Sequence, residues 1–371
     1  MQQVEHEQVV IGRDEPSGLV AVVAIHSTAL GPALGGTRMR PYPDLAAAID
    51  EALELSRAMT AKNALAGLDH GGGKAVIVGD PATVKTPELL LAYGRLVASL
   101  GGRYVTACDV GTYVADMDIV HEVNPWTTGR SPARGGAGDS GIMTALGVHA
   151  AMRACAEQAW GSPSLAGRRI GIEGLGKVGA RLAALAVADG AEVFASDVDE
   201  RAVQRVRAEH PQLTVLDRAA LLTAPLDVLA PCALGGTLSA SVVESLRCAV
   251  VCGGANNQFA GPGVDLALAD RGILHAPDFV ANGGGVIAVA AELPGYRQDL
   301  VTEGVLAIGA TTRRVLARAS ADAVTPWAAA LAMAAERVDA GSATPFRTFP
   351  APVPHRSVEP GANSERGQRG G

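Results

Sequence analysis

Two lysines in the first quarter of the sequence have the surroundings that amine chemistry needs. Lys74 follows three consecutive glycines, residues 71–73, and leads into an apolar segment, while Lys62 follows an amphipathic helical pattern. An amine at the head of a buried strand loses hydration, and a second ammonium nearby repels its proton, so both effects favour the neutral amine that a general base requires. A fixed ammonium instead suits a substrate carboxylate. The spacing alone leaves open that both lysines are solvated on a loop.

One carboxylate, Asp109, stands where the next apolar segment, residues 103–107, has just ended. A carboxylate at the mouth of a strand can hold an amino group or relay protons. Its alternative role is to cap a helix that begins near Val114. We assign the two acidic residues inside that helix, Asp116 and Asp118, to the helix and not to the chemistry.

A glycine-rich turn of the kind that binds a dinucleotide occupies residues 174–179. Its members match G-x-G-x-x-G and are Gly174, Leu175, Gly176, Lys177, Val178 and Gly179. The motif follows an apolar strand and opens a helix, which is the context that nucleotide binding requires: a tight turn, a close approach of backbone to pyrophosphate, and close packing of helix on strand. Asp197 ends the next strand, where a carboxylate accepts hydrogen bonds from ribose and repels a 2′-phosphate, so NAD is favoured over NADP.

The elements that must position these residues divide the chain into two domains of an α/β protein. We expect residues 1–138 to form a substrate-binding and catalytic domain, joined by a C-terminal helix at about 326–340. Alternating and apolar patterns there predict strands at 9–11, 19–25, 75–78 and 103–107 and helices at 46–59 and 87–100.

Residues 139–325 are expected to form a doubly wound, Rossmann-type NAD-binding domain. Five predicted strands, at 169–173, 192–196, 226–229, 249–252 and 273–276, alternate with helices, which implies a parallel sheet. A loop at 128–140 precedes the helix 142–160, and we interpret its Arg130 and Arg134 as solvated. A long helix is predicted at 302–322, and the Pro-rich tail 342–371 is predicted to be disordered.

The composition excludes several other classes of protein. The 371 residues carry 31 basic and 38 acidic side chains, a formal net charge of −7, which argues against a nucleic-acid or anionic-membrane binder. No apolar run approaches the roughly 18 residues that span a bilayer, and the polar start resembles no signal peptide. Five scattered cysteines form no disulfide framework, and no spacing suggests a metal site. We expect a cytoplasmic enzyme.

Six ordered motifs carry a resemblance to a known family. They are GPALGGTR at 31–38, MTAKNALAGLDHGGGK at 59–74, TACDVGT at 106–112, PCALG at 231–235, GANNQ at 254–258 and APDFVANGGG at 276–285. Together they resemble the amino-acid dehydrogenases that act on leucine, valine and phenylalanine, relatives of glutamate dehydrogenase. The similarity covers about residues 10–335, and the run 106–118 is most similar to valine dehydrogenases.

The resemblance implies a reaction and a role for each matching residue. The reaction is NAD-dependent, reversible oxidative deamination of an L-amino acid to a 2-oxo acid, ammonium and NADH. By analogy Lys62 binds the substrate carboxylate with Asn257, Lys74 is the general base, and Asp109 handles the amino group. Gly35 and Gly72 would bring backbone to the substrate, and Thr144 and Asn256 would hold the nicotinamide. Relatives of this kind are homo-oligomers.

The resemblance also places four apolar residues around the substrate side chain: Leu34, Ala107, Val286 and Val289. None could pair with a second carboxylate, so glutamate is disfavoured as a substrate. L-Valine is favoured, and leucine or phenylalanine remains an alternative because one methylene is worth only roughly 1–3 kcal/mol. A non-catalytic NAD-binding relative is the alternative from another functional class.

Overall fold

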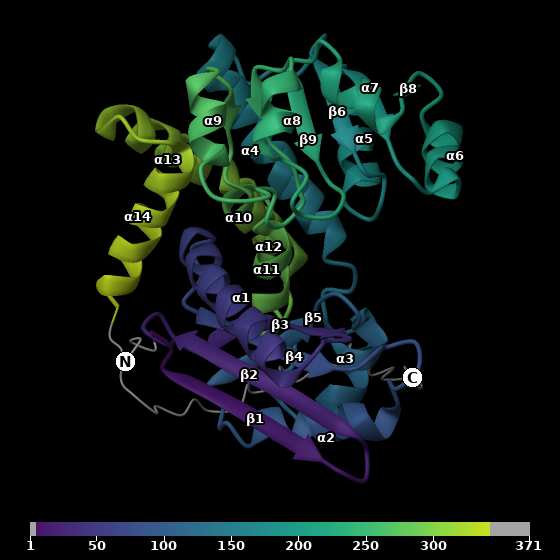
Figure 1. Ribbon diagram of the computed structural model, residues 1–371, viewed down its shortest axis with the longest axis vertical. Helices are drawn as coiled ribbons and strands as arrows, with labels where there is room; N and C mark the ends of the chain where they lie inside the picture. The colour runs from purple at the N-terminus through teal and green to yellow at the C-terminus, as the bar shows by residue number, and fades with distance from the viewer. Residues whose placement is uncertain (1–4, 342–371) are drawn as a thin grey trace, which may run out of the picture.

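The computed structural model describes residues 5–341, and its ribbon forms two lobes, each built on its own β-sheet (Figure 1). Helix α4, Gly141–Trp160, follows the elements of the first lobe and precedes the strands of the second. The tail 342–371, for which the sequence predicts disorder, lies outside the described residues. The domain boundaries drawn from the sequence stay predictions.

The N-terminal sheet has five strands in the order β1-β2-β4-β3-β5. The strands are Gln8–Asp14 (β1), Leu19–Ser27 (β2), Ala33–Arg40 (β3), Gly71–Val78 (β4) and Tyr104–Cys108 (β5). β1, β2 and β4 pair antiparallel, whereas β4, β3 and β5 are parallel. The sequence did not predict β3, because Gly35 and Gly36 interrupt the apolar run that marks a strand.

Helices cover both faces of this sheet. They are α1 (Leu45–Leu65), α2 (Pro87–Ala98) and α3 (Val114–His121). Successive strand residues point to opposite faces, so Val22 and Val76 pack in one apolar core with side chains of α1. Their neighbours Val23 and Ile77 pack in a second core with side chains of α2 and α3.

The three glycines before Lys74 belong to strand β4 and not to a turn, which corrects the sequence interpretation. β4 begins at Gly71, and Lys74 lies inside the strand opposite Ala24 of β2. A Cβ added to Gly71 would lie 1.8 Å from the carbonyl oxygen of Ser27. Glycine is therefore required here because neighbouring backbone comes too close for a side chain.

Helix α1 is longer than predicted, and Lys62 lies in its last turn instead of beyond its end. Ala61 to Leu65 continue the helix because each is compatible with helical backbone. Gly67, with a φ of 76°, follows the helix end.

The second sheet has six parallel strands in the order β11-β10-β9-β6-β7-β8. The strands are Arg169–Glu173 (β6), Glu192–Ser196 (β7), Thr214–Val215 (β8), Val228–Pro231 (β9), Val250–Val251 (β10) and Leu274–His275 (β11). The winding reverses between β6 and β9, which is the order of a doubly wound dinucleotide-binding fold. The predicted fold class is confirmed, and within this sheet the sequence missed only the two-residue strand β8.

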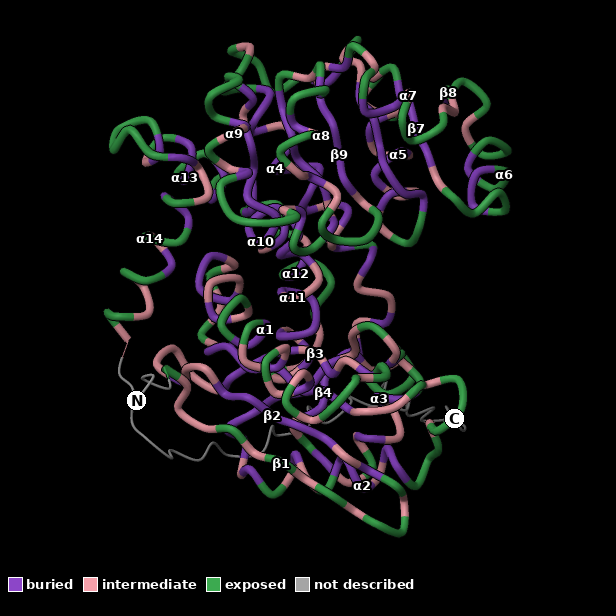
Figure 2. The backbone as a smooth tube through the Cα atoms, in the orientation of Figure 1, coloured by how far each residue is buried: buried purple, intermediate pink, exposed green. Residues whose placement is uncertain are grey.

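The helices of the second lobe surround this sheet. They are α5 (Gly179–Ala188), α6 (Glu200–Glu209), α7 (Arg218–Thr223), α8 (Ala240–Ser245), α9 (Val264–Asp270), α10 (Asp278–Ala281) and α11 (Gly284–Ala290), and a short 3₁₀ helix, Pro132–Arg134, lies in the loop before α4. Figure 2 shows buried backbone along the central strands and exposed backbone around α6.

The C-terminal helices return to the first lobe. The predicted helix 302–322 is two helices, α12 (Gln298–Leu306) and α13 (Ile308–Asp322), which meet at Ala307. The last helix, α14 (Pro326–Asp339), shares an apolar cluster with Ala64 and Leu65 of α1. α14 therefore packs against the end of α1 that carries Lys62.

We expect Gly35→Ala to destabilise the first lobe severely. A Cβ at Gly35 would lie 1.7 Å from the carbonyl oxygen of Gly73, so β3 and β4 would have to separate. The loss in unfolding free energy should be about 3 kcal/mol, the upper end of overpacking costs. Denaturant unfolding measures it, with Gly261→Ala as the matched control, since a Cβ at Gly261 meets no atom within 4 Å. Equal stability of the two variants would contradict the close strand contact.

Candidate active site

An ion pair between Lys74 and Asp109 forms the centre of the candidate site. Lys74 Nζ donates a hydrogen bond to Oδ2 of Asp109, which directly follows β5. Lys74 is 5% exposed, and the Asp109 side chain retains 17% of its exposure. Both charges are largely removed from water, so each depends on the other for stabilisation. The sequence proposed these residues separately, and β3, lying between β4 and β5, completes the sheet that brings them together.

Asp109 has a second cationic partner that the sequence did not identify. Arg38 of β3 donates from Nε to the same oxygen, Oδ2, at 3.2 Å. Burial alone would raise the pKa of Asp109, but the charges of Lys74 and Arg38 hold that pKa well below its usual range. Asp109 is therefore ionised, as the chemistry requires. The sequence considered only the effects that favour a neutral Lys74, whereas the structure adds a carboxylate that accepts a hydrogen bond from its amine.

The Lys62 side chain connects the first lobe to the second. Its Nζ donates to Oδ1 of Asn256 at 2.9 Å. The side chain keeps partial contact with solvent, yet the surrounding protein lowers the pKa of Lys62 to about 8. Burial is the largest cause, the charge of Asp278 opposes it, and the ammonium of Lys74 adds to it. The repulsion between the two lysines thus lowers the pKa of Lys62, the residue expected to carry a fixed charge.

The loop at residues 254–258 presents Asn256, and not Asn257, to Lys62 in this arrangement. Oδ1 of Asn256 also accepts a hydrogen bond from Nδ2 of Asn282 at 2.9 Å. Asn257 is exposed and has a φ of 51°, a left-handed conformation that asparagine tolerates. Among the described residues, no hydrogen bond joins its side chain to Lys62. The roles predicted for Asn256 and Asn257 stay predictions.

Asp278 is a buried acid near Lys62 for which the sequence assigned no role. It is 3% exposed and accepts hydrogen bonds from the backbone N–H groups of Phe279, at 2.8 Å, and Gln258, at 3.3 Å. Burial raises the pKa of Asp278, while the charge of Lys62 opposes the rise. Through these hydrogen bonds, Asp278 connects the 254–258 loop to α10. It lay inside a recognised motif, but nothing in its spacing separated it from an ordinary helix cap.

All four residues expected around the substrate side chain meet in one apolar cluster. Leu34, Ala107 and Val289 are buried there, and Val286 packs against them. The rest of the cluster, which the sequence did not name, is Val105, Ala290, Leu68, Trp126 and Leu293. This group joins the first sheet to α11 through apolar contacts.

Packing within the protein explains the two glycines that were predicted to approach the substrate. A Cβ at Gly72 would lie 2.1 Å from Oγ1 of Thr60 on α1, and Gly35 is pressed against Gly73 in the same way. Glycine is needed at both positions without any ligand. Their predicted contact with the substrate stays a prediction.

The glycine-rich turn between β6 and α5 fits a dinucleotide. Gly174 has a φ of 98°, and a Cβ at Gly179 would lie 1.8 Å from the carbonyl oxygen of Gly174, so both are required by the turn itself. A Cβ at Gly176, by contrast, meets no protein atom within 4 Å. Open space beside a glycine at a helix N-terminus is what a pyrophosphate requires. Lys177 is exposed, and Leu175 and Val178 complete the turn.

The carboxylate of Asp197 lies directly beside this turn. It accepts hydrogen bonds from the backbone N–H of Leu175 and, at 2.8 Å, from that of Asp199. Asp199 itself caps α6 through its side chain. Thr144, in the first turn of α4, donates a hydrogen bond to the carbonyl oxygen of Ser140. Its side chain also lies close to Gly285, where an added Cβ would be 2.7 Å from Oγ1 of Thr144.

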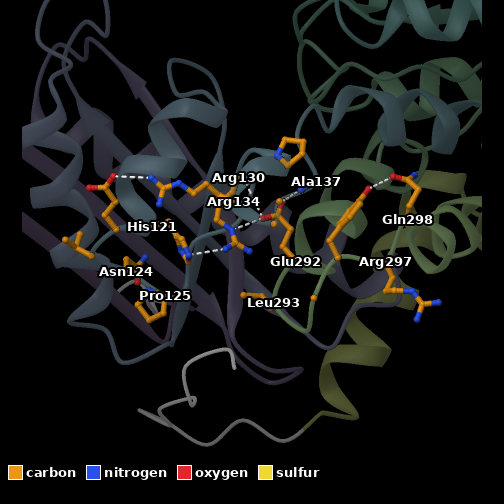
Figure 3. Close-up of a pocket in the computed structure, with 17 residues that line it drawn as sticks. His121, Asn124, Pro125, Arg130, Arg134, Ala137, Glu292, Leu293, Arg297 and Gln298 are labelled. Atoms are coloured by element: carbon orange, nitrogen blue, oxygen red, sulfur yellow. Dashed lines mark hydrogen bonds and ion pairs between the residues drawn. The ribbon is translucent and has the colours of Figure 1, made fainter. Parts of the chain in front are cut away.

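A further buried acid, Glu292, holds the loop that leads from the first lobe to α4. Its carboxylate accepts a hydrogen bond from the N–H group of Gly129 at 3.0 Å. It also accepts from the N–H group of Ala137, at 2.8 Å, and from Nε of Arg130 (Figure 3). Arg130 is therefore paired and mostly buried, which corrects the interpretation that it is solvated; Arg134 is half-exposed beside Glu122. An open pocket of about 1250 Å³ lies next to this contact.

Residues 5–341 contain neither a cluster of metal-binding side chains nor a membrane-spanning helix. No three His, Cys, Asp or Glu side chains gather there as metal ligands. No helix in that range has the length and apolar character needed to cross a membrane.

Comparison with known proteins gives two family matches. Residues 5–124 match the dimerisation domain of Glu/Leu/Phe/Val dehydrogenases, and residues 195–339 match the family described as glutamate/leucine/phenylalanine/valine dehydrogenase.

Individual relatives are similar over most of the chain. The sequence is 58% identical over 335 residues to a valine dehydrogenase of Streptomyces virginiae, covering 90% of this chain and 94% of that protein. It is 43% identical over 339 residues to a leucine dehydrogenase of Bacillus subtilis, covering 91% and 92%. The crystal structure of L-tryptophan dehydrogenase from Nostoc punctiforme superposes with a TM-score of 0.80 at 35% identity, covering 91% and 97%.

Proposed function

Because this chain belongs to the Glu/Leu/Phe/Val dehydrogenase family and is an amino-acid dehydrogenase, we propose that it oxidatively deaminates a branched-chain aliphatic L-amino acid, preferring L-valine. The reaction is reversible and yields a 2-oxo acid, ammonium and the reduced cofactor. One observation carries the proposal: the buried pair of Lys74 and Asp109 adjoins β3 and β5, the strands that supply Leu34 and Ala107 to the apolar cluster. Acid–base groups thus lie beside an apolar cluster suited to contact an aliphatic side chain.

The four residues expected around the substrate side chain support an aliphatic substrate because they pack together in one apolar cluster. A glutamate side chain there would bury its γ-carboxylate without a partner, at a cost of several kcal/mol. Valine and leucine differ by a single methylene, worth roughly 1–3 kcal/mol, so the pocket should discriminate between them only modestly.

Each polar group of the cleft has a step in the proposed reaction. Lys62, as an ammonium, binds the substrate carboxylate. Asp109 pairs with the substrate amino group and, once hydride has left Cα, supports the cationic iminium that remains. Lys74 takes a proton from the water that attacks this carbon. A bound nicotinamide supplies the hydride acceptor. Further proposed contacts are those of Asn257, Gly35 and Gly72 with the substrate and of Thr144 and Asn256 with the nicotinamide.

We assign NAD as the cofactor because of two features of the second lobe. The free space at Gly176 accommodates pyrophosphate on the N-terminus of α5. The carboxylate of Asp197, held beside the same turn, can accept ribose hydroxyl hydrogen bonds and would repel a 2′-phosphate.

The assembly and the compartment are also part of the proposal. β1 is an edge strand of its sheet, and its Val9 and Ile11 are 37% and 47% exposed. We propose that this edge contributes to a homo-oligomer, in keeping with the dimerisation domain matched by residues 5–124. All five cysteines are free thiols, which suits a reducing compartment such as the cytoplasm.

We expect the purified protein to reduce NAD with L-valine, leucine and isoleucine, less with phenylalanine, and not with glutamate.

Lys74→Ala should lower kcat by about 10³-fold or more because the proposed general base is lost. NADH absorbance measures both, and fluorescence should show that the variant still binds NAD. Lys85→Ala is the matched control: Lys85 is also an ion-paired lysine, but its partner is Asp116. No turnover on any aliphatic amino acid would favour the non-catalytic NAD-binding alternative.

The cofactor assignment predicts a change of preference in Asp197→Asn. The amide keeps an acceptor for the backbone N–H of Leu175 but removes the charge that repels a 2′-phosphate, so the kcat/KM ratio of NAD to NADP should fall roughly tenfold or more. Asp199→Asn, two residues further along, should leave the ratio unchanged. An unaltered ratio in Asp197→Asn would remove the ribose assignment.

The lowered pKa of Lys62 predicts how carboxylate binding depends on pH. The dissociation constant of 3-methylbutanoate, an analogue without an amino or keto group, should be constant near neutrality and rise above pH 8, because the free protein then loses the ammonium. The rise should approach roughly tenfold per pH unit. Isothermal titration calorimetry measures it, and Lys62→Arg, which stays charged, should show a flat profile. Constant affinity of the unmodified protein up to pH 9.5 would contradict the role of Lys62.

A further inference from the structure

Asp109 is bound by two cations through a single oxygen atom. Lys74 Nζ and Arg38 Nε both donate to Oδ2, from neighbouring strands β4 and β3. Arg38 is itself mostly buried, with 18% of its side chain exposed. A guanidinium keeps its proton at every pH at which proteins fold, whereas an ammonium can release one. The two partners of Asp109 therefore differ in chemistry although they share one acceptor.

Arg38 is anchored on its far side by a second carboxylate. Its Nη1 donates to Oε1 of Glu51 on α1 at 2.8 Å. Glu51 also accepts hydrogen bonds from Arg40, at 3.1 Å, and from the hydroxyl of Tyr42. The charges thus alternate in sign from Lys74 through Asp109, Arg38 and Glu51 to Arg40. Because both ends of Arg38 are held, its guanidinium cannot follow a movement of Lys74.

We propose that Arg38 is a positioning residue that keeps Asp109 in place and ionised while Lys74 passes through its neutral form. The inference rests on the proposed function, in which Lys74 alternates between ammonium and amine. When Lys74 is neutral, Asp109 loses one of its two cations in a site with little water. Arg38 then remains as the counter-charge, so the carboxylate does not have to retain the proton on Lys74 or take one up itself.

The other charged and titratable groups around Lys74 do not supply this counter-charge. Lys62 on α1 is a cation, but its pKa is lowered to about 8 and its hydrogen bond goes to Asn256. Asp278 on α10 acts on Lys62. Burial raises the pKa of the Cys108 thiol, as does the charge of Asp109, so this thiol is neutral near pH 7. Among the described residues, Arg38 is the permanent cation hydrogen-bonded to Asp109.

The test compares Arg38→Gln with Arg40→Gln. Both arginines lie on β3 and donate to Glu51, but only Arg38 reaches Asp109. Removing the charge of Arg38 should make Lys74 retain its proton to higher pH, so the acidic limb of kcat/KM should move upward by roughly one pH unit, with kcat falling more than KM rises. Arg38→Lys should restore most of the shift, and Arg40→Gln should leave the profile in place.

A readout that does not need turnover separates this inference from the proposed function. Competitive labelling of lysines with acetic anhydride across pH, with Lys74 identified by mass spectrometry, should show its midpoint displaced to higher pH in Arg38→Gln and unchanged in Arg40→Gln. Circular dichroism checks that both variants fold, and Arg38→Met, which also removes the charge, replaces Arg38→Gln if the latter does not. An unshifted labelling midpoint in a folded variant that lacks the charge of Arg38 overturns the inference even if valine is turned over. A shifted midpoint without turnover of any amino acid supports it while refuting the proposed function.

Discussion

Three charged side chains, Lys74, Asp109 and Arg38, share a volume from which most water is excluded, and the other parts of the site depend on how their charges balance. Taking such groups out of water costs several kcal/mol for each ion, which their mutual attraction must offset. Removal of one partner leaves an unpaired buried charge and typically costs about 3–5 kcal/mol. The same contact therefore contributes to stability and holds the amine of Lys74 against a carboxylate that stays ionised.

The backbone around this contact is built to bring strands and helices unusually close. Gly35, Gly71 and Gly72 each occupy positions where a Cβ would overlap a neighbouring backbone or side-chain atom. Because these glycines have no side chains, β3, β4 and α1 can approach one another closely. This close approach determines the positions of Lys74 on β4 and Lys62 on α1. Glu292, in the segment after α11, accepts hydrogen bonds from the loop before α4. The apolar cluster around Leu34 and Val289 is therefore connected to the loop that leads from the first lobe to the second.

Much of this organisation could be predicted from local patterns. The strand–glycine–helix order around Gly176, the alternation of strands and helices after it, and the apolar character of Leu34 and Val289 all follow from residue types at short spacing. Errors arose where glycine was interpreted by its usual preference for turns. β3 was missed and the start of β4 was taken as a turn, because close strand packing also requires glycine and leaves the same local signal.

The amino-acid sequence by itself determined the fold class, the nucleotide-binding turn and the set of polar residues available for chemistry, because these depend on periodicity and on motifs of a few residues. Only the tertiary structure decided which of them meet. It placed Arg38 and Lys74 on one oxygen of Asp109, directed Asn256 to Lys62, and buried Asp278 and Glu292 with backbone donors. Charge balance in a buried site depends on distances of a few ångströms between residues far apart in the chain, and local sequence carries no record of those distances.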